Sequence, residues 1–181
     1  MREFPWNRIV TVDDVDESLV SSFTCGNEAM DNWFLNKALS WCYLGFCQVY
    51  IALDEEGIVG FFSLSPTQLE PRSLSGSMRK GKNSMSHPGL LLGRIAVRKG
   101  LQGTEAHVGS LLLEHAIYRA VAISQTVGGR FIVLDAKNEE LCEWYSRHGF
   151  RSLRDSELRM IMPMKDARAM TRGLGEEHFL F

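Results

Sequence analysis

The sequence predicts an α/β fold, with a mixed central sheet and helices on both faces. Three observations lead to this prediction. Helical and strand-like segments alternate, the strand-like segments are rich in β-branched and aromatic residues, and residues 90–97 (LLLGRIAV) form a continuous apolar run that suits a central strand. With 181 residues, 45% of them apolar and 23% charged, the chain has the proportions of one globular domain.

The first clear element is a helix that begins in the segment FTCGNEAMD. Asn27 or Thr24 can cap its N-terminus, because both side chains accept hydrogen bonds from backbone N–H groups. Apolar residues between positions 30 and 39 follow helical spacing. Gly45 then marks the end of the helix.

A β-hairpin follows this helix. Residues 47–54 alternate in polarity, and a short turn joins them to a second strand, residues 58–69, which is expected to end near Pro66. Residues 71–89 are rich in Ser, Gly and basic residues and contain few large apolar groups. They are therefore expected to form a long loop before the central strand.

The second half of the chain continues the alternation. Gly128 and Gly129 separate a long helix from a buried strand, Gly149 suits the end of a short helix, and Pro163 favours an edge position for the last strand. The elements expected here are a helix over residues 108–124, a strand over 130–136, a helix over 138–150 and a strand over 157–164.

Composition excludes several classes of protein. A net charge of −2 is not that of a chain that binds nucleic acid over its whole surface. The four cysteines form no C-x-x-C pair and no histidine cluster accompanies them, so no metal site is expected and the thiols are expected to be reduced. The N-terminal segment lacks the apolar core of a signal peptide, and no run reaches the ~18 apolar residues of a membrane span. We expect a cytoplasmic protein without membrane contact.

The central strand is followed by a glycine-bearing loop and a leucine-rich helix, within LQGTEAHVGSLLLEHA. The first N–H groups of a helix lack helical partners and the helix dipole adds partial positive charge, so this loop can bind an anion. The loop is neither a Walker A loop nor a G-x-G-x-x-G motif. An ordinary turn between a strand and a helix is the alternative interpretation.

A second candidate segment is LDAKNEELCEWYSRHGF, which places Asn138 at the end of a strand and Tyr145 on the following helix. A tyrosine at this position either packs its ring in the core or serves in catalysis. The residues by themselves leave both interpretations open.

Residues 20–166 resemble the GNAT superfamily of acyl-CoA-dependent N-acetyltransferases, and more narrowly the GNAT toxins of bacterial toxin–antitoxin pairs. The similarity rests on the segments FTCGNEAMDNWF, IVGFFSLSP, LLLGRIAV and NEELCEWYSRHGFRSL. The first and third are specific to the toxin-like branch, whereas the element Y-x-x-x-G-F is common to many members. The resemblance implies the GNAT acyl-CoA N-acyltransferase fold, acetyl-CoA as cofactor, and direct attack of an amine on the thioester.

The resemblance also implies roles for individual residues. Tyr145 would donate a proton to the leaving CoA thiolate, because a phenol with an ordinary pKa of about 10 is protonated at neutral pH. No general base stands out, and an aminoacyl ester needs none, because its α-amino group is less basic than an ordinary α-amine with a pKa of about 8. The expected cofactor-binding residues are Ile95, Ala96, Val97, Gln102, Gly103, Thr104, His107, Val108, Gly109, Ser110 and Asn138.

The loop departs from the family pattern Q/R-x-x-G-x-G/A. From Gln102 to Gly109 it spans seven positions instead of five, His107 replaces the middle glycine, and Glu105 adds a negative charge. We expect the extra residues to bulge Glu105 into solvent, away from a pyrophosphate that it would repel, while the turn at Val108 still presents N–H groups. The other interpretation is that the loop no longer binds acetyl-CoA.

Basic residues gather between Pro71 and Thr104, where seven Lys or Arg residues and no acidic residue occur. Either a solvated loop or a surface for tRNA phosphates fits this pattern. The candidate substrate contacts are Arg79, Lys80, Lys82, Arg94 and Lys99.

The first functional interpretation is a GNAT toxin that acetylates the α-amino group of aminoacyl-tRNA. The resemblance implies a ribbon-helix-helix antitoxin as partner and a homodimer. The alternatives are an ordinary GNAT acetyltransferase of a small amine or a protein N-terminus, and a GNAT-fold binding module with a degenerate loop. Residues 1–181 are expected to form one domain, with a core over 20–166, a basic loop over 71–89 and a C-terminal tail over 167–181.

Overall fold

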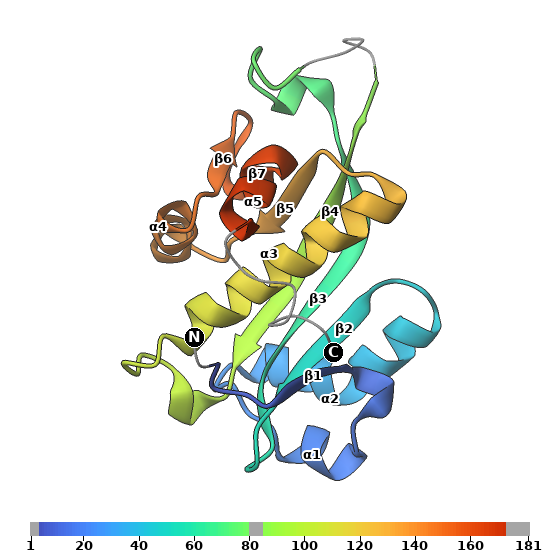
Figure 1. Cartoon of the computed structure of the whole chain (residues 1–181), viewed down its shortest axis with the longest axis vertical. Coiled ribbons are helices and arrows are strands. Elements are labelled where there is room, and N and C mark those ends of the chain that lie inside the picture. Colours follow the sequence, from blue (N-terminus) through green and yellow to red (C-terminus); the bar gives the residue numbers. More distant parts are fainter. Residues whose placement is uncertain (1–3, 80–84, 173–181) are drawn as a thin grey trace. The chain divides into compact units, whose positions relative to one another are not determined.

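The computed structural model describes residues 4–79 and 85–172, and within them seven strands form a mixed sheet (Figure 1). The strands are β1 (Arg8–Thr11), β2 (Gln48–Leu53), β3 (Ile58–Leu69), β4 (His87–Val97), β5 (Phe131–Asp135), β6 (Arg151–Leu153) and β7 (Ser156–Pro163). Their order in the sheet is β1-β2-β3-β4-β5-β7-β6. β4 and β5 run parallel, whereas β1–β2, β2–β3, β5–β7 and β6–β7 are antiparallel pairs. The predicted hairpin and mixed sheet are thereby confirmed.

Helices connect these strands. They are α1 (Glu17–Ser22), α2 (Glu28–Tyr43), α3 (Val108–Val127), α4 (Glu139–Arg147) and α5 (Met164–Thr171), with short 3-10 helices η1 (Val12–Asp14), η2 (Pro71–Ser73) and η3 (Lys99–Leu101). As predicted, Asn27 caps α2, because its Oδ1 accepts a hydrogen bond from the N–H of Met30 at 2.9 Å. Across the described part of the chain, every helix is too short or too polar to span a membrane.

The backbone divides into two compact units, and β3, β4 and α3 each contribute to both. Within the described residues, unit 1 is formed by 4–65 and 94–116, and unit 2 by 66–79, 85–93 and 117–172. Unit 1 therefore holds β1, β2, α1, α2 and the loop that leads into α3. Unit 2 holds β5, β6, β7, α4 and α5.

In unit 1, α2 and α3 cover opposite faces of the sheet. Neighbouring residues of a strand point to opposite faces. Phe61 of β3 stacks on Phe34 of α2 with ring centroids 4.1 Å apart, whereas Phe62 meets His115 of α3 at 5.9 Å. This arrangement matches the predicted placement of helices on both faces. Other members of the core beneath α2 are Phe23, Trp33, Val49 and Ile51.

In unit 2, one face of β5 packs in a small apolar core through Phe131 and Val133. The Oγ of Ser73 donates to Oδ2 of Asp155 at 2.6 Å, which ties η2 to the turn between β6 and β7. The remaining buried members of this core are Leu69, Leu74, Leu153 and Ile161.

Several short elements are not evident from the sequence. β1, α1, β6 and α5 span four, six, three and eight residues, which is too few for a hydrophobic period to stand out. α5 occupies Met164–Thr171, where the sequence indicates the start of a C-terminal tail, and residues 173–181 of that tail lie outside the described residues. β4 begins at His87, before the apolar run, and β3 continues beyond Pro66 to Leu69.

The prediction that Pro163 lies in an edge strand is wrong, because β7 lies between β5 and β6. Successive backbone nitrogens of a strand point to opposite sides. The N–H of Met164 donates to the carbonyl of Arg130 at 2.8 Å, so the nitrogen of Pro163 faces the side of β6. The pairing of β7 with β6 extends only to Ile161, opposite Arg151, so Pro163 removes no donor from that ladder.

We predict that Gly60→Ala destabilises the protein by about 1–3 kcal/mol, because a Cβ at this position would lie 2.5 Å from the carbonyl oxygen of Ala96 and 2.9 Å from Leu112. Urea denaturation measures the change. The matched control is Gly100→Ala, since a Cβ there meets nothing within 4 Å, and its effect is expected to stay within about 0.5 kcal/mol. Equal stability of the two variants would contradict the close approach of β3 and β4.

Candidate functional site

Gln102 holds the loop between β4 and α3 in place. Its side-chain Nε2 donates to the carbonyl oxygens of Cys25 at 2.7 Å and Val97 at 2.8 Å. An amide nitrogen carries two hydrogens, so both are used within unit 1. Gln102, one of the expected cofactor-binding residues, therefore acts through its side chain on the shape of the loop.

The turn into α3 is built around left-handed backbone. His107 has φ 48° and Gly103 has φ 66°, a region that glycine enters more easily than other residues. The N–H of His107 donates to Thr104 at 3.1 Å, and its carbonyl accepts the first helical bond from Leu111 at 3.1 Å. His107 thus has the backbone conformation that suits glycine, the residue the family pattern places there.

The N-terminus of α3 forms the electropositive end of this loop. Val108 and Gly109 open the helix, and N–H groups in a first turn have no helical partners. Glu105 is exposed, as expected of a bulged loop. The arrangement can therefore bind an anion through backbone N–H groups and the helix dipole.

The end of β4 supplies backbone groups beside this loop. The register of β4 with β5 covers Gly89 to Leu92, so the N–H groups of residues 95–97 lie beyond that ladder. Ala96 and Val97 have buried side chains, and Ile95 is half-buried. Gly60, which lets β3 approach Ala96, is not among the residues predicted for the site. An isolated glycine within a strand is the sequence pattern that indicates such a close approach of two backbones.

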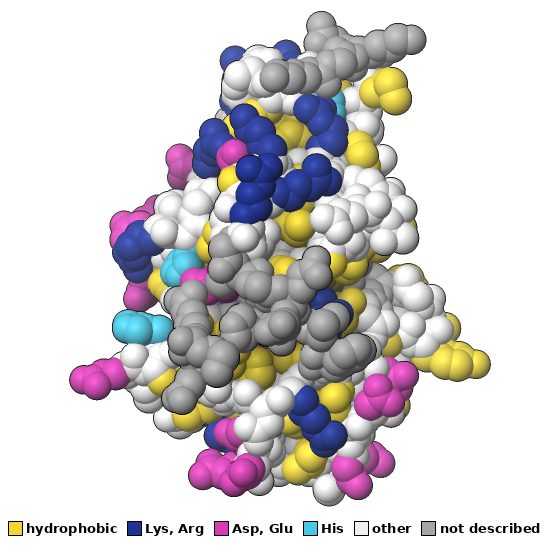
Figure 2. Space-filling view, in the orientation of Figure 1, with side chains coloured by type: hydrophobic (Ala, Val, Ile, Leu, Met, Phe, Trp, Pro, Cys, Tyr) yellow, Lys and Arg dark blue, Asp and Glu magenta, His cyan; other side chains and the backbone are white. Residues whose placement is uncertain are grey.

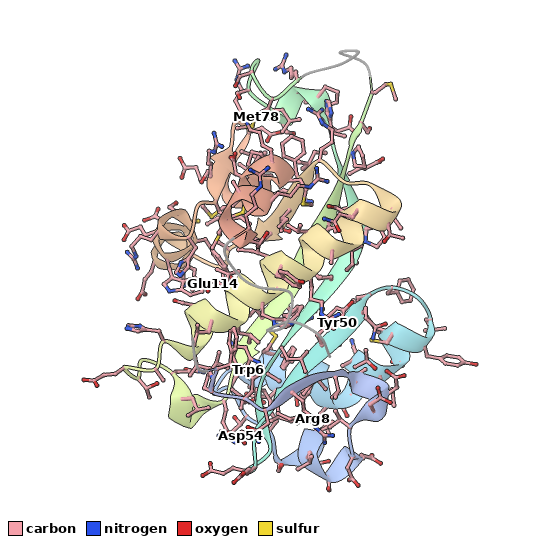
Figure 3. All side chains as sticks on the ribbon, viewed as in Figure 1. Trp6, Arg8, Tyr50, Asp54, Met78 and Glu114 are labelled. Atoms are coloured by element: carbon pink, nitrogen blue, oxygen red, sulfur yellow. The ribbon has the colours of Figure 1, made fainter. Side chains whose placement is uncertain are left out.

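Charges close to the loop are partly neutralised. Arg98 forms an ion pair with Asp54 at 2.7 Å and another with Glu56 at 3.4 Å. Asp54 is labelled in Figure 3. Arg98 is therefore engaged with the turn between β2 and β3. The guanidinium of Arg94 lies 4.2 Å from the ring centroid of Trp33, and burial lowers the pKa of Arg94 from its usual value. Arg94, a candidate tRNA contact, is thus half-buried against an aromatic ring.

In unit 2, Asn138 and Tyr145 lie at the start and near the end of α4. The Oδ1 of Asn138 accepts from the N–H of Leu141 at 2.9 Å, so this side chain caps the helix. Tyr145 is buried, with edge-on ring contacts to Trp144 at 4.9 Å and Phe150 at 5.9 Å. Burial raises the pKa of Tyr145 to about 12. Its phenol therefore keeps its proton at neutral pH and can act as an acid.

The remaining candidate substrate contacts are distributed over both units. Arg79 is half-buried and its Nε donates to the carbonyl of Leu74 at 2.9 Å, whereas Lys99 is exposed. Lys80 and Lys82 lie outside the described residues.

The chain is similar to known proteins over most of its length. Residues 45–152 match the family described as the acetyltransferase (GNAT) domain. A tRNA-acetylating toxin of Mycobacterium tuberculosis is 29% identical over 159 residues, which cover 88% of this chain and 93% of the relative.

Two solved structures of AtaT have a similar backbone. AtaT complexed with acetyl-methionyl-tRNAfMet gives a TM-score of 0.81 at 24% identity and covers 90% of this chain and 98% of its own. The second structure is a tyrosine-to-phenylalanine mutant of the AtaT toxin, bound to the C-terminus of the antitoxin AtaR and acetyl-CoA. It gives a TM-score of 0.74 at 22% identity, and the match covers 91% of this chain and 98% of that one. The predicted fold is thereby confirmed, and the chain belongs to the acetyltransferase (GNAT) domain family.

Proposed function

We propose that this chain transfers the acetyl group of acetyl-CoA to the α-amino group of an aminoacyl-tRNA, and that it is the toxin of a toxin–antitoxin pair. The observation that carries the proposal is the alignment with a tRNA-acetylating toxin over 93% of that protein, in a chain of the GNAT family. AtaT, which has the same fold, was solved with acetyl-methionyl-tRNAfMet and with acetyl-CoA.

The cofactor-binding groups proposed in unit 1 are backbone N–H groups. Those of Ile95, Ala96 and Val97 bind the pantetheine arm and polarise the thioester carbonyl. Those of the loop from Gly103 to Ser110 hold the pyrophosphate, apart from the N–H of His107, which donates to Thr104. The N–H of Arg98 donates to Val59 of β3 at 2.8 Å, and N–H groups alternate along a strand, so those of Ile95 and Val97 face the side where the β4–β5 ladder has ended. This supports the first role for these two residues. The left-handed His107 and the N-terminus of α3 support the second.

Tyr145 is proposed as the general acid of the reaction. The neutral amine of the substrate attacks the thioester carbonyl carbon, the carbon–sulfur bond breaks, and the sulfur takes a proton from the phenol. The proton of the amine passes to water, and the phenol is reprotonated from solvent. The phenol of Tyr145 is protonated at neutral pH, as an acid must be, and burial raises its pKa to about 12, so proton transfer has to coincide with the negative charge that develops on sulfur as the carbon–sulfur bond breaks.

Partner binding is proposed on the same grounds. AtaT binds an antitoxin, AtaR. We propose that this chain likewise binds an antitoxin, of the ribbon-helix-helix type, and that it forms a homodimer. We further propose that it acts in the cytoplasm and that residues 1–181 form a single domain. Apolar side chains left exposed on and after α2 support a contact surface. They are Leu35, Leu39, Trp41, Tyr43, Leu44 and Phe46.

The proposal predicts N-acetylated amino acid at the 3′ end of tRNA when the purified chain is incubated with acetyl-CoA and a mixture of aminoacyl-tRNAs. Mass spectrometry after nuclease digestion identifies the product and the amino acid chosen. Acetylation of small amines or protein N-termini, with none of aminoacyl-tRNA, would replace the proposal with an ordinary acetyltransferase. The absence of acetyl-CoA binding in calorimetry would remove both.

We predict that Tyr145→Phe lowers kcat by about a hundredfold or more while leaving the fold and acetyl-CoA affinity intact, since one general acid contributes about 10²–10⁴-fold. Quenched time-course assays of acetylation measure kcat, and calorimetric titration measures the affinity for acetyl-CoA. The control is Tyr43→Phe, whose ring is 91% exposed. Because the pKa of Tyr145 is raised, kcat should not fall at the ordinary tyrosine value of about 10. A turnover equal to that of the control would mean that the sulfur takes its proton from elsewhere.

We predict that His107→Gly keeps acetyl-CoA affinity within about twofold, whereas His107→Val weakens it by about tenfold or more. The reason is the backbone, because φ 48° is easy for glycine and strained for a β-branched residue. Calorimetric titration with acetyl-CoA compares the two. If both substitutions weaken binding equally, the imidazole itself contacts the cofactor.

A further inference from the structure

A basic pocket of about 440 Å³ lies within unit 2, and none of the residues proposed to bind the cofactor is among those that line it. Its cationic side chains come from three separate segments: Arg130 precedes β5, Arg151 begins β6, and Lys165 and Arg168 belong to α5. None of the described residues that line it is acidic. Figure 2 shows Lys and Arg side chains gathered on the face of unit 2 that carries α5.

Arg130 is held in a fixed position at this pocket. Its Nη2 donates to the carbonyl of Met78 at 3.1 Å, and its Nη1 donates to Nδ1 of His87. Met78 is labelled in Figure 3. Burial and the charge of Arg130 both lower the pKa of His87, so the imidazole stays neutral and accepts this bond. The guanidinium also lies 5.3 Å from the ring centroid of Phe131. These contacts place a permanent positive charge in the pocket, at little cost in side-chain freedom when a ligand binds.

The other cations leave the pocket strongly positive. Arg151 pairs with Asp166 at 2.8 Å, and the Nη2 of Arg168 donates to Ser124 at 3.3 Å, while Lys165 is exposed. Four cationic groups against one carboxylate give a local charge of +3. A guanidinium presents five N–H donors, and the printed contacts of Arg151 and Arg168 each use one nitrogen, so these two forks can still reach a ligand with several acceptor oxygens. Arg130 uses both terminal nitrogens within unit 2 and contributes its charge.

We propose that the basic pocket, formed by Arg130, Arg151, Lys165 and Arg168, binds a backbone phosphate of the tRNA substrate. Arginine forks match phosphate oxygens, and such contacts fix the position of a nucleic acid without reading its sequence. Ser77 and Phe131 also line the pocket and give it polar and apolar surface for the sugars beside the phosphate. This inference rests on the proposed function, and it adds a contact that no local run of basic residues in the sequence reveals.

The test uses the double variant Lys165→Ala/Arg168→Ala in the full chain, with deacylated tRNA as the probe. We expect about tenfold weaker binding and a decrease of about one to two in the slope of log affinity against log salt, because each phosphate contact contributes roughly 0.7–0.9 to that slope. The control Arg8→Ala/Lys37→Ala removes the same charge from exposed positions of unit 1. The charge-preserving variant Lys165→Arg/Arg168→Lys should keep near wild-type affinity.

Four outcomes overturn the inference. The first is an unchanged tRNA affinity and salt slope in Lys165→Ala/Arg168→Ala. The second is an equal loss in the control Arg8→Ala/Lys37→Ala, which would indicate a diffuse effect of net charge. The third is a loss of acetyl-CoA affinity in calorimetry, with tRNA affinity unchanged, which would assign the pocket to phosphates of the cofactor. The fourth is a loss of antitoxin binding alone, which would assign the pocket to acidic groups of that partner.

The inference and the proposed function fail in different ways. The first requires tRNA binding that depends on Lys165 and Arg168, and this is measured without acetyl-CoA. The second requires acetylation by the wild-type chain. If the wild type acetylates aminoacyl-tRNA and the double variant has an unchanged KM, the pocket is excluded and the function stands. If tRNA binding depends on the pocket but no aminoacyl-tRNA is acetylated, the function fails and the pocket stands.

Discussion

The bridge that Gln102 makes between the carbonyls of Cys25 and Val97 is the contact on which the geometry of the cofactor loop depends. It connects the segment before α2, the end of β4 and the loop that enters α3. A buried carbonyl without a partner costs about 1–3 kcal/mol, so the two acceptors favour one loop conformation strongly. In this loop conformation Glu105 is exposed.

A second constraint is the close approach of β3 and β4. Because Gly60 has no Cβ, the carbonyl of Ala96 and the side chain of Leu112 can both pack against this strand. The same strand carries Phe61 on the opposite face, where it stacks on Phe34 of α2. The position of the α3 N-terminus therefore follows from packing, since the sheet, α2 and α3 share residues of one strand.

The distribution of positive charge differs between the sequence and the folded chain. Along the sequence, basic residues concentrate between positions 71 and 104. In the structure, Arg98 is engaged with Asp54 and Arg94 packs on Trp33, so two members of that run are not simply solvated. The basic pocket joins Arg130, Arg151, Lys165 and Arg168, which lie in three separate segments of the sequence. Charge that is scattered along a chain gathers only after strands and helices have paired.

The sequence by itself determined the long elements and the chemistry of the family. Hydrophobic periods over α2, the hairpin and α3 are long enough to specify their type. The segments FTCGNEAMDNWF, IVGFFSLSP, LLLGRIAV and NEELCEWYSRHGFRSL resemble a family of acetyl-CoA-dependent enzymes, although the loop from Gln102 to Gly109 departs from the family pattern. Tertiary structure decided the rest. Short elements such as β1 and α5 form through partners distant in the chain, and an interior β7 tolerates Pro163 because β6 stops short of it. The raised pKa of Tyr145 and the basic pocket likewise arise from burial and from distant side chains, which local sequence does not encode.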